Sequence, residues 1–428
     1  MIGKRIVITT LGSFGDIHPY IPIALELSAR GHSPVIVTTE AYREKIESEG
    51  LEFTPTRPRL PSFDERDEIR RMVAKMMDVK TGAEELLKGI LMSSLREQYE
   101  DLDRATDGAD MLVTHPITFA GPLVAQKKKL RWISTILSPS VFLSLHDPIV
   151  VPNAPWASKL HFIPGFNRVL KGLMGKYTER WFREVAVLRN ELGLPPDGHP
   201  LFEGMHSPEL VLALFSRVIA DTKPDWPMNT HVTGFPFYDK LDMMPTPPGV
   251  QKFLDEGAPP IVFTLGSSAV WVAGDFYKES IKAAQALGQR ALLLVGDARN
   301  MPEGVLPEGV AAFEYAPYSE VLPRAQAIVH QGGIGTTAQA LRAGKPTLIV
   351  PFSYDQPDNA ARVARLGVAR ILQRDGYRAD RVTKELEQLL GEPHYREKAA
   401  AVGQIVQSED GARTATDLIE RRFKRDEG

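Results

Sequence analysis

The stretch AIVHQGGIGTTAQALRAGKPTLIVPFSYDQ, residues 327–356, decides the fold that we predict for this chain. An apolar run, Ala327–His330, ends in glycines, and an alanine-rich segment of helical periodicity follows at about Gly335–Ala343. A second apolar run, Thr347–Pro351, leads into a polar loop, after which we expect a helix from Asn359 to Gly367. This order predicts a strand, a glycine turn, a helix and a second strand, which is the repeating unit of a parallel α/β sheet.

The glycine turn predicts a binding site for a diphosphate. Glycines without side chains let a ligand approach the backbone, and here they stand where a helix begins. The start of a helix presents unpaired N–H groups and partial positive charge, which suit a phosphate. The residues that form this predicted site are Gly332, Gly333, Gly335, Thr336, Thr337 and His330.

Asp355 and Gln356 extend the predicted site beyond the diphosphate. They follow the second strand and offer a carboxylate and an amide that can hydrogen-bond sugar hydroxyls. Each feature also has an interpretation that involves no ligand. Glycine turns between a strand and a helix are common, and His330 alone could be a hydrogen-bonded histidine of the core. The joint spacing favours a nucleotide-sugar site.

The whole chain resembles the GT-B nucleotide-sugar glycosyltransferases, a family that includes UDP-glycosyltransferases (GT1), sterol glucosyltransferases and antibiotic glycosyltransferases. The donor motif carries the resemblance: His330-Gln-Gly-Gly-Ile-Gly-Thr-Thr, then Ala-Gly-Lys-Pro, then Asp355-Gln-Pro-Asp-Asn359. Further segments look like the catalytic rhamnosyltransferase chain of rhamnolipid synthesis and its bacterial relatives. They are Gly12-Ser-Phe-Gly-Asp-Ile-His-Pro19, Ser138-Pro-Ser140, His206-Ser-Pro208, Asp225-Trp-Pro227, Thr233-Gly-Phe-Pro236 and Gly274-Asp-Phe-Tyr277.

The resemblance implies a GT-B fold with two facing, Rossmann-like, doubly wound α/β domains and a cleft between them. A chain of 428 residues also suggests two domains of about 200 residues each. We expect an acceptor-binding domain over residues 1–242, joined by a C-terminal helix at 410–428. The donor-binding domain is expected over residues 243–409, after a proline-rich linker at Met244–Gly249.

The resemblance assigns further donor contacts. Ser267 and Ser268 follow the predicted strand Ile261–Gly266 and face the diphosphate, as does Gly15 of the first loop. Tyr315 matches the aromatic residue that stacks on the base, and the main chain at Ala316 reads the edge of that base. Ala338 stands where plant members carry a glutamate that bonds the ribose, which makes a dTDP donor easier to accept.

The first loop, Gly12–His18, is implied to supply the general base that takes the proton of the acceptor hydroxyl. Many family members have histidine at this position of the loop, whereas this chain has Asp16. The histidine of this loop, His18, lies two residues further on. We predict Asp16 as the base, with His18 as an alternative base or a partner; such assistance contributes roughly 10²–10⁴-fold to the rate. Asp16 also fits a helix N-cap, and the two roles are compatible.

Acceptor contacts are expected at the carboxyl ends of the N-terminal strands, where parallel sheets bind their ligands. The residues are Phe14, Ile17, His115, Phe119, Ser138, Ser140 and Phe142. The segment Trp156–Arg189 interleaves aromatic and basic residues. It fits an amphipathic core helix pair, a roof over an apolar acceptor, or peripheral contact with a membrane.

Composition excludes other classes of protein. A net charge of -3 gives no basic face for nucleic acid, and the absence of cysteine excludes thiolate catalysis and cysteine metal sites. The D-x-D at Asp101–Asp103 lies in a charged helical run and is interpreted as a solvated face, so no metal or other cofactor is expected. We find no signal peptide and no long apolar segment, which indicates a cytoplasmic protein.

The sequence thus predicts an inverting, metal-independent hexosyltransferase. It moves a hexosyl or deoxyhexosyl group from a UDP- or dTDP-sugar to a hydroxyl of an apolar small-molecule acceptor. The alternatives are a rhamnolipid-type rhamnosyltransferase that uses a hydroxy fatty acyl acceptor, a non-catalytic nucleotide-sugar binding protein, and a sugar-nucleotide epimerase.

Overall fold

The computed structural model describes residues 3–152, 154–239 and 245–424. The chain divides into an N-terminal unit, Met1–Tyr238 with Asp410–Gly428, and a C-terminal unit, Asp239–Glu409. The expected boundary between residues 242 and 243, and the first residue of the expected linker, Met244, lie outside the described residues.

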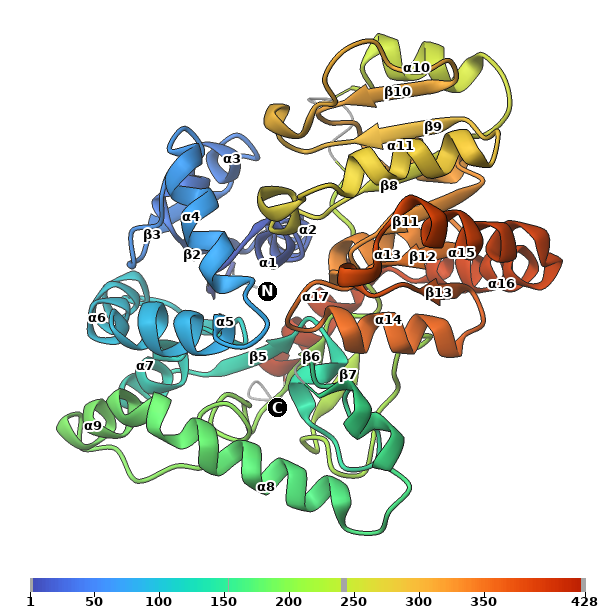
Figure 1. The fold of residues 1–428 in the computed structure, drawn as a ribbon. Coiled ribbons are helices and arrows are strands. Elements are labelled where there is room, and N and C mark those ends of the chain that lie inside the picture. The colour runs from blue at the N-terminus through green and yellow to red at the C-terminus, as the bar shows by residue number, and fades with distance from the viewer. Residues whose placement is uncertain (1–2, 153, 240–244, 425–428) are drawn as a thin grey trace. The chain divides into compact units, whose positions relative to one another are not determined.

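The N-terminal unit contains a seven-stranded sheet in the order β3-β2-β1-β4-β5-β6-β7, with parallel neighbours throughout (Figure 1). Its strands are β1 Arg5–Thr9, β2 Ser33–Thr38, β3 Glu52–Pro55, β4 Met111–Thr114, β5 Trp132–Ile136, β6 Val211–Ala213 and β7 Thr230–Val232. Its α-helices are α1 Phe14–Ile17, α2 Tyr20–Ala29, α3 Arg43–Glu47, α4 Arg66–Met76, α5 Gly82–Glu84, α6 Leu95–Ala105, α7 Ala120–Lys128, α8 Phe166–Glu179, α9 Arg183–Glu191 and α17 Gly411–Lys424.

The C-terminal unit contains a six-stranded parallel sheet in the order β10-β9-β8-β11-β12-β13. Its strands are β8 Ile261–Thr264, β9 Ala291–Leu294, β10 Val310–Phe313, β11 Ala327–His330, β12 Thr347–Ile349 and β13 Ala369–Ile371. Its α-helices are α10 Pro248–Asp255, α11 Phe276–Ala286, α12 Tyr318–Val321, α13 Ile334–Arg342, α14 Gln356–Arg365, α15 Ala379–Gly391 and α16 Pro393–Ser408. The prediction of two Rossmann-like domains is confirmed, while their facing arrangement around a cleft stays a prediction.

Short helices complete both units. The 3₁₀-helices are η1 Glu40–Tyr42, η3 Pro139–Phe142, η4 Pro155–Leu160, η5 Arg180–Phe182, η6 Ala269–Val272, η7 Ala298–Asn300, η8 Leu322–Arg324 and η9 Arg374–Gly376, and η2 Glu85–Met92 is a π-helix.

The central strands of both sheets are almost entirely buried, which explains their continuous apolar sequences. In β1 four of the five residues are buried, and in β8 and β11 all four are. A parallel sheet covered by helices on both faces requires such runs instead of an alternating pattern.

The last helix, α17, returns to the N-terminal unit and packs against α2. Arg30, just after α2, contacts Asp417 at 2.5 Å and Glu420 at 3.0 Å, and the Nε2 atom of His32 lies 3.1 Å from Glu420. These ion pairs connect the two ends of the chain within one unit.

Two sequence-based expectations are wrong in detail. The helix expected to begin at Asn359 begins at Gln356, so Asp355 occupies the N-cap position of α14. The D-x-D does not lie wholly on a solvated face, because Asp101 is buried and paired with the Arg57 guanidinium at 2.9 Å. Burial would raise the pKa of Asp101, but the hydrogen bonds from Arg57 hold that pKa below its ordinary value.

Candidate functional site

Most of the predicted site residues lie where the strand order of each sheet reverses. In the N-terminal sheet the reversal falls between β1 and β4, and in the C-terminal sheet it falls between β8 and β11. The loops that leave neighbouring strands there diverge to opposite faces of the sheet and leave a crevice for ligands. The loop after β1 carries Asp16, and the turn after β11 carries the glycine motif.

His330 ends β11 and is completely buried. Its Nδ1 atom accepts a hydrogen bond from the Gly332 N–H at 3.0 Å. Burial lowers the pKa of His330 to about 3, so the ring is neutral and its proton resides on Nε2. This Nε2–H has no hydrogen-bond partner among the described residues. This N–H is therefore available to a ligand acceptor beside the glycine turn.

The turn between His330 and α13 requires glycine at two positions. Gly332 has a φ of +86°, and a Cβ there would lie 2.8 Å from the Ile349 side chain. At Gly333 a Cβ would lie 2.7 Å from the Gln331 amide nitrogen. Gly335 differs, because a Cβ there would meet no atom within 4 Å. The open space beside Gly335 leaves the first turn of the helix accessible.

The start of α13 carries no side-chain cap at Gly333. The first N–H groups of a helix have no partner within the helix, so those of residues 334–336 point outward. Thr336 and Thr337 are both buried, and the Thr337 hydroxyl has no hydrogen-bond partner among the described residues. The turn therefore gathers uncapped amides and a buried imidazole donor at one place.

Gln331 joins this turn to the loop after β8, a role that the sequence did not suggest. Its side chain is buried between the two loops, since a Cβ on Gly266 would lie 2.1 Å from its amide nitrogen. Ser267 and Ser268 follow Gly266, are half-buried, and lie across the strand reversal from the glycine turn. The structure thus brings the predicted serines to the same edge of the sheet as His330.

Asp355 is tied to the glycine turn through Asn359, whose bracing role the sequence does not indicate. The Asn359 amide donates to Asp355 Oδ2 at 2.7 Å and to the Gly332 carbonyl at 3.0 Å. Gln356 is buried, and its Oε1 atom accepts from the N–H groups of Phe352 and Ser353 at 2.8 and 3.2 Å. Asp355 therefore lies beside the turn, while the oxygen of Gln356 supports the loop.

The predicted base-binding residues follow β10. Tyr315 is half exposed, as a stacking platform requires, and Ala316 is buried. Tyr318 lies at the start of α12, and its hydroxyl is 2.8 Å from the Thr264 hydroxyl. This bond anchors the segment 315–318 to β8.

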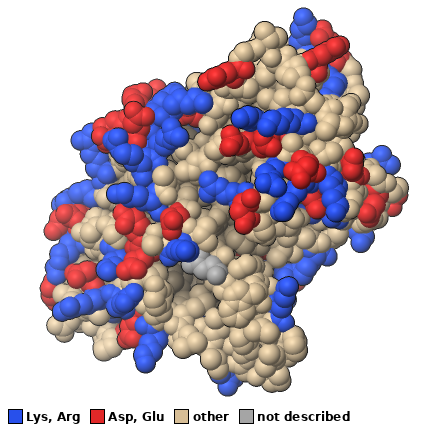
Figure 2. Space-filling view, viewed as in Figure 1, with Lys and Arg blue, Asp and Glu red and all other residues tan. Residues whose placement is uncertain are grey.

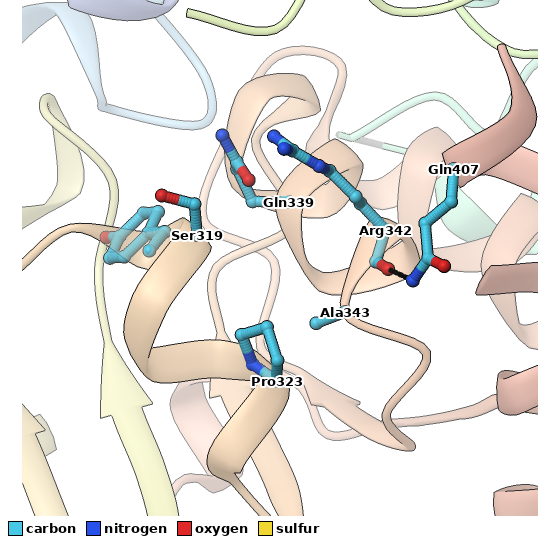
Figure 3. Close-up of a pocket in the computed structure, with 7 residues that line it drawn as sticks. Ser319, Pro323, Gln339, Arg342, Ala343 and Gln407 are labelled. Atoms are coloured by element: carbon cyan, nitrogen blue, oxygen red, sulfur yellow. Dashed lines mark hydrogen bonds between the residues drawn. The ribbon is translucent and has the colours of Figure 1, made fainter. Parts of the chain in front are cut away.

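A cavity of about 250 Å³ lies between α12, η8, α13 and α16 (Figure 3). It is lined by Tyr318, Ser319, Pro323, Gln339, Arg342, Ala343 and Gln407. Its polar groups are partly engaged already, since the Gln407 amide donates to the Arg342 carbonyl at 2.6 Å. None of the predicted donor-binding residues lines it, so it is not the predicted site.

Asp16 is held by a capping box at the start of α1 in the N-terminal unit. Its Oδ2 atom accepts from the Ser13 N–H at 2.7 Å, and Ser13 Oγ in turn accepts from the Gly15 N–H at 3.3 Å. Gly12 has a φ of +129°, and a Cβ there would lie 2.3 Å from Asp16 Oδ2. The loop is therefore shaped around this carboxylate.

The second oxygen of Asp16 faces a histidine from the neighbouring strand. Asp16 Oδ1 lies 3.3 Å from Nε2 of His115, which follows β4. Because His115 Nδ1 accepts from the Ile117 N–H at 3.2 Å, the ring N–H is assigned to Nε2, which faces Asp16. The His115 side chain is 4% exposed and that of Asp16 is 33% exposed. Asp16 is thus the member of the pair that solvent or a substrate can reach.

His18, the alternative base, has a different environment. Its ring lies 5.1 Å from the Phe14 ring and 5.2 Å from the Tyr238 ring. Burial and the charge of Lys45 lower the pKa of His18 to about 3, so the ring is neutral. The Nε2 atom of His18 is buried, whereas the Asp16 side chain is 33% exposed, and this difference in access favours Asp16 over His18 as the base.

The predicted acceptor residues divide between surface and core. Phe14 is half-buried and stacks on the exposed ring of Phe63, with 5.1 Å between ring centres. Ser140 is half-buried, and its Oγ lies 3.2 Å from Oγ of the buried Ser138 after β5. Three more are buried: Ile17, Phe119, which packs on Phe182, and Phe142, which stacks on Trp226. Sequence periodicity did not separate these two groups.

The described residues contain no group of three or more His, Asp or Glu side chains arranged to hold a metal ion. Within the same residues, no helix has the length and apolar character needed to cross a membrane.

The geometry defines a GT-B type of protein, with two Rossmann-like units and an uncapped helix start as the candidate donor site. The C-terminal domain profile of erythromycin biosynthesis protein CIII-like proteins matches residues 283–418. The N-terminal domain profile of glycosyltransferase family 28 matches residues 6–94.

Known proteins resemble the chain over nearly its whole length. O-mycaminosyltylonolide 6-deoxyallosyltransferase of Streptomyces fradiae is 32% identical over 97% of both chains. CalG4, the calicheamicin glycosyltransferase, has a TM-score of 0.71 at 19% identity over 99% of both chains. VinC, a glycosyltransferase solved in complex with dTDP, has a TM-score of 0.68 at 19% identity over 97% of this chain and 98% of its own. The chain belongs to the GT-B nucleotide-sugar glycosyltransferase family and is a glycosyltransferase.

Proposed function

We propose that this enzyme transfers a deoxyhexosyl or hexosyl group from a nucleoside diphosphate sugar to a hydroxyl of an apolar small molecule, with inversion. The observation that carries the proposal is the start of α13. There, uncapped amides at residues 334–336 lie beside the unpartnered Nε2–H of His330. A diphosphate suits this turn because the amides and the imidazole N–H are fixed donors, and none of them requires a proton to be moved.

The donor is proposed to be a dTDP-linked sugar. The relative from Streptomyces fradiae is named for the transfer of a 6-deoxyallosyl group, and VinC was solved with dTDP. In this chain Ala338 is a small residue in the middle of α13 and offers no carboxylate for a ribose 2′-hydroxyl. A donor that contains deoxyribose has no 2′-hydroxyl, so it does not need that carboxylate.

The reaction proceeds through a single displacement. Asp16 accepts the proton of the acceptor hydroxyl, and the oxygen forms a bond to the anomeric carbon of the sugar. The bond from that carbon to the diphosphate oxygen breaks, and the electron pair leaves with the nucleoside diphosphate. His115 holds the Asp16 carboxylate in place, and the α13 amides with Ser267 and His330 stabilise the leaving diphosphate without a metal ion.

The acceptor is proposed to be apolar. Phe14 and Phe63 present stacked rings beside the Asp16 loop, which suits a large hydrophobic molecule with few polar groups. A hydroxy fatty acyl acceptor, as in rhamnolipid-type transferases, belongs to the same class. We also propose peripheral contact with membranes through the aromatic and basic segment 156–189.

The test combines ligand binding with product analysis. The purified enzyme is screened by thermal shift against UDP, dTDP and their sugars, and the stabilising donor is then incubated with a mixed panel of apolar alcohols. We expect stabilisation by dTDP and a mass-spectrometric product heavier than the acceptor by one sugar residue. Binding without transfer or hydrolysis would indicate a non-catalytic binding protein, and no binding of any nucleotide would refute the proposal.

A further inference from the structure

Helix α8 presents an apolar stripe to solvent. Val169, Leu173 and Tyr177 recur every fourth residue and therefore lie on one face, and their exposed fractions are 62%, 62% and 55%. Among the fourteen residues of the helix only Thr178 is buried. An amphipathic helix of a globular protein normally turns its apolar face to the core, so this exposure is unusual.

The segment before α8 extends the exposed apolar surface. Trp156, Phe162 and Ile163 are exposed to 59%, 81% and 41%. At the lower end of the N-terminal unit, the region of α8 in Figure 1, Figure 2 shows broad uncharged surface with Lys and Arg side chains beside it. We name Trp156, Phe162, Ile163, Val169, Leu173 and Tyr177 the α8 stripe.

Basic residues without acidic partners accompany the stripe. Between Pro155 and Arg183 there are six basic residues and one acidic residue, Glu179, although the whole chain has a net charge of -3. They are Lys159, Arg168, Lys171, Lys176, Arg180 and Arg183. None of the six forms an ion pair within the described part of the chain, and Arg180 instead lies over the Tyr177 ring at 5.0 Å.

We propose that the α8 stripe is a docking surface for an anionic lipid membrane, with α8 lying in the headgroup region. Exposed Trp, Phe and Tyr side chains next to unpaired Lys and Arg are the composition of interfacial helices. A second copy of this chain fits poorly, because two such surfaces in contact would bring like charges together. This surface specifies where the membrane contact of the proposed function occurs and so rests on that proposal. Its test does not depend on sugar transfer.

The test is cosedimentation of the full-length protein with vesicles. One vesicle type contains phosphatidylcholine alone, and the other contains phosphatidylglycerol in addition. The variants are Leu173→Asp, on the stripe, and the double variant Lys176→Glu with Arg180→Glu beside it. Val305→Asp is the matched control, because Val305 is 99% exposed and lies in the C-terminal unit.

We expect binding to the phosphatidylglycerol vesicles that weakens with salt. The vesicle affinity should fall by at least about tenfold in Leu173→Asp and in the Lys176→Glu, Arg180→Glu double variant. The Val305→Asp protein should bind like the wild type, and nucleotide binding should be equal in all four proteins, which separates this result from a failure of the donor site. Wild-type protein that stays in the supernatant would overturn the proposal. So would vesicle binding that survives Leu173→Asp, or a dimer in light scattering that Leu173→Asp abolishes.

Discussion

Replacing His330 by asparagine tests whether its buried Nε2–H binds the donor. The amide oxygen of asparagine can stand where Nδ1 stands, so the hydrogen bond from the Gly332 N–H is kept. Only the unpartnered Nε2–H is removed. A hydrogen bond to a charged group contributes about 1.5–3 kcal/mol, which corresponds to a roughly 10- to 100-fold weaker nucleoside diphosphate affinity.

The assay is isothermal titration of dTDP and UDP into both proteins, with urea unfolding as a check on the fold. His330→Gln serves as the matched control, since its amide nitrogen reaches the Nε2 position but leaves the Gly332 N–H without an acceptor. This control should bind nucleotide better than His330→Asn and be less stable by about 1–3 kcal/mol. If His330→Asn binds both nucleotides as tightly as wild type, the imidazole does not contact the diphosphate.

Three further predictions concern the base, the helix start and the pH dependence of stability. Asp16→Asn keeps an oxygen for the Ser13 N–H, so nucleotide binding should persist while turnover falls by about 10²–10⁴-fold; unchanged transfer would move the base role elsewhere. Gly335→Ala should raise the free energy of unfolding by about 0.5–1 kcal/mol but weaken nucleotide binding, because its methyl group would fill the open space; tight binding would place the phosphate elsewhere. His330 has a pKa of about 3 when folded and 6.5 as a free side chain, so the unfolded chain binds the extra proton between these values. Stability should therefore fall as the pH drops below about 6.5, by up to about 1.4 kcal/mol per pH unit, and urea midpoints of His330→Asn should show a smaller slope than those of the wild type.

The sequence predicted the sheet strands well because buried parallel strands require uninterrupted apolar runs. The strands Ala327–His330, Met111–Thr114 and Val310–Phe313 have the predicted ends. The start of α14 was misplaced because Pro357 was interpreted as part of a loop. Proline in the first turn of a helix loses no hydrogen bond, so it begins α14 instead of delaying it.

Most contacts between residues far apart in the chain could not be predicted from the sequence. Asp101 pairs with Arg57, forty-four positions away, and its D-x-D spacing carried no sign of that partner. The contact between Asp16 and His115 could have been predicted, because both residues follow strands that are neighbours where the strand order of the sheet reverses. Nothing in the sequence around Gln331 or Asn359 showed that their amides brace the glycine turn.

A crystal structure of the enzyme with dTDP shows whether the start of α13 binds the donor diphosphate. We expect phosphate oxygens within hydrogen-bond distance of the main-chain amides of residues 334–336 and of His330 Nε2. A nucleotide bound elsewhere in the C-terminal unit, with those amides facing only water, would contradict this expectation.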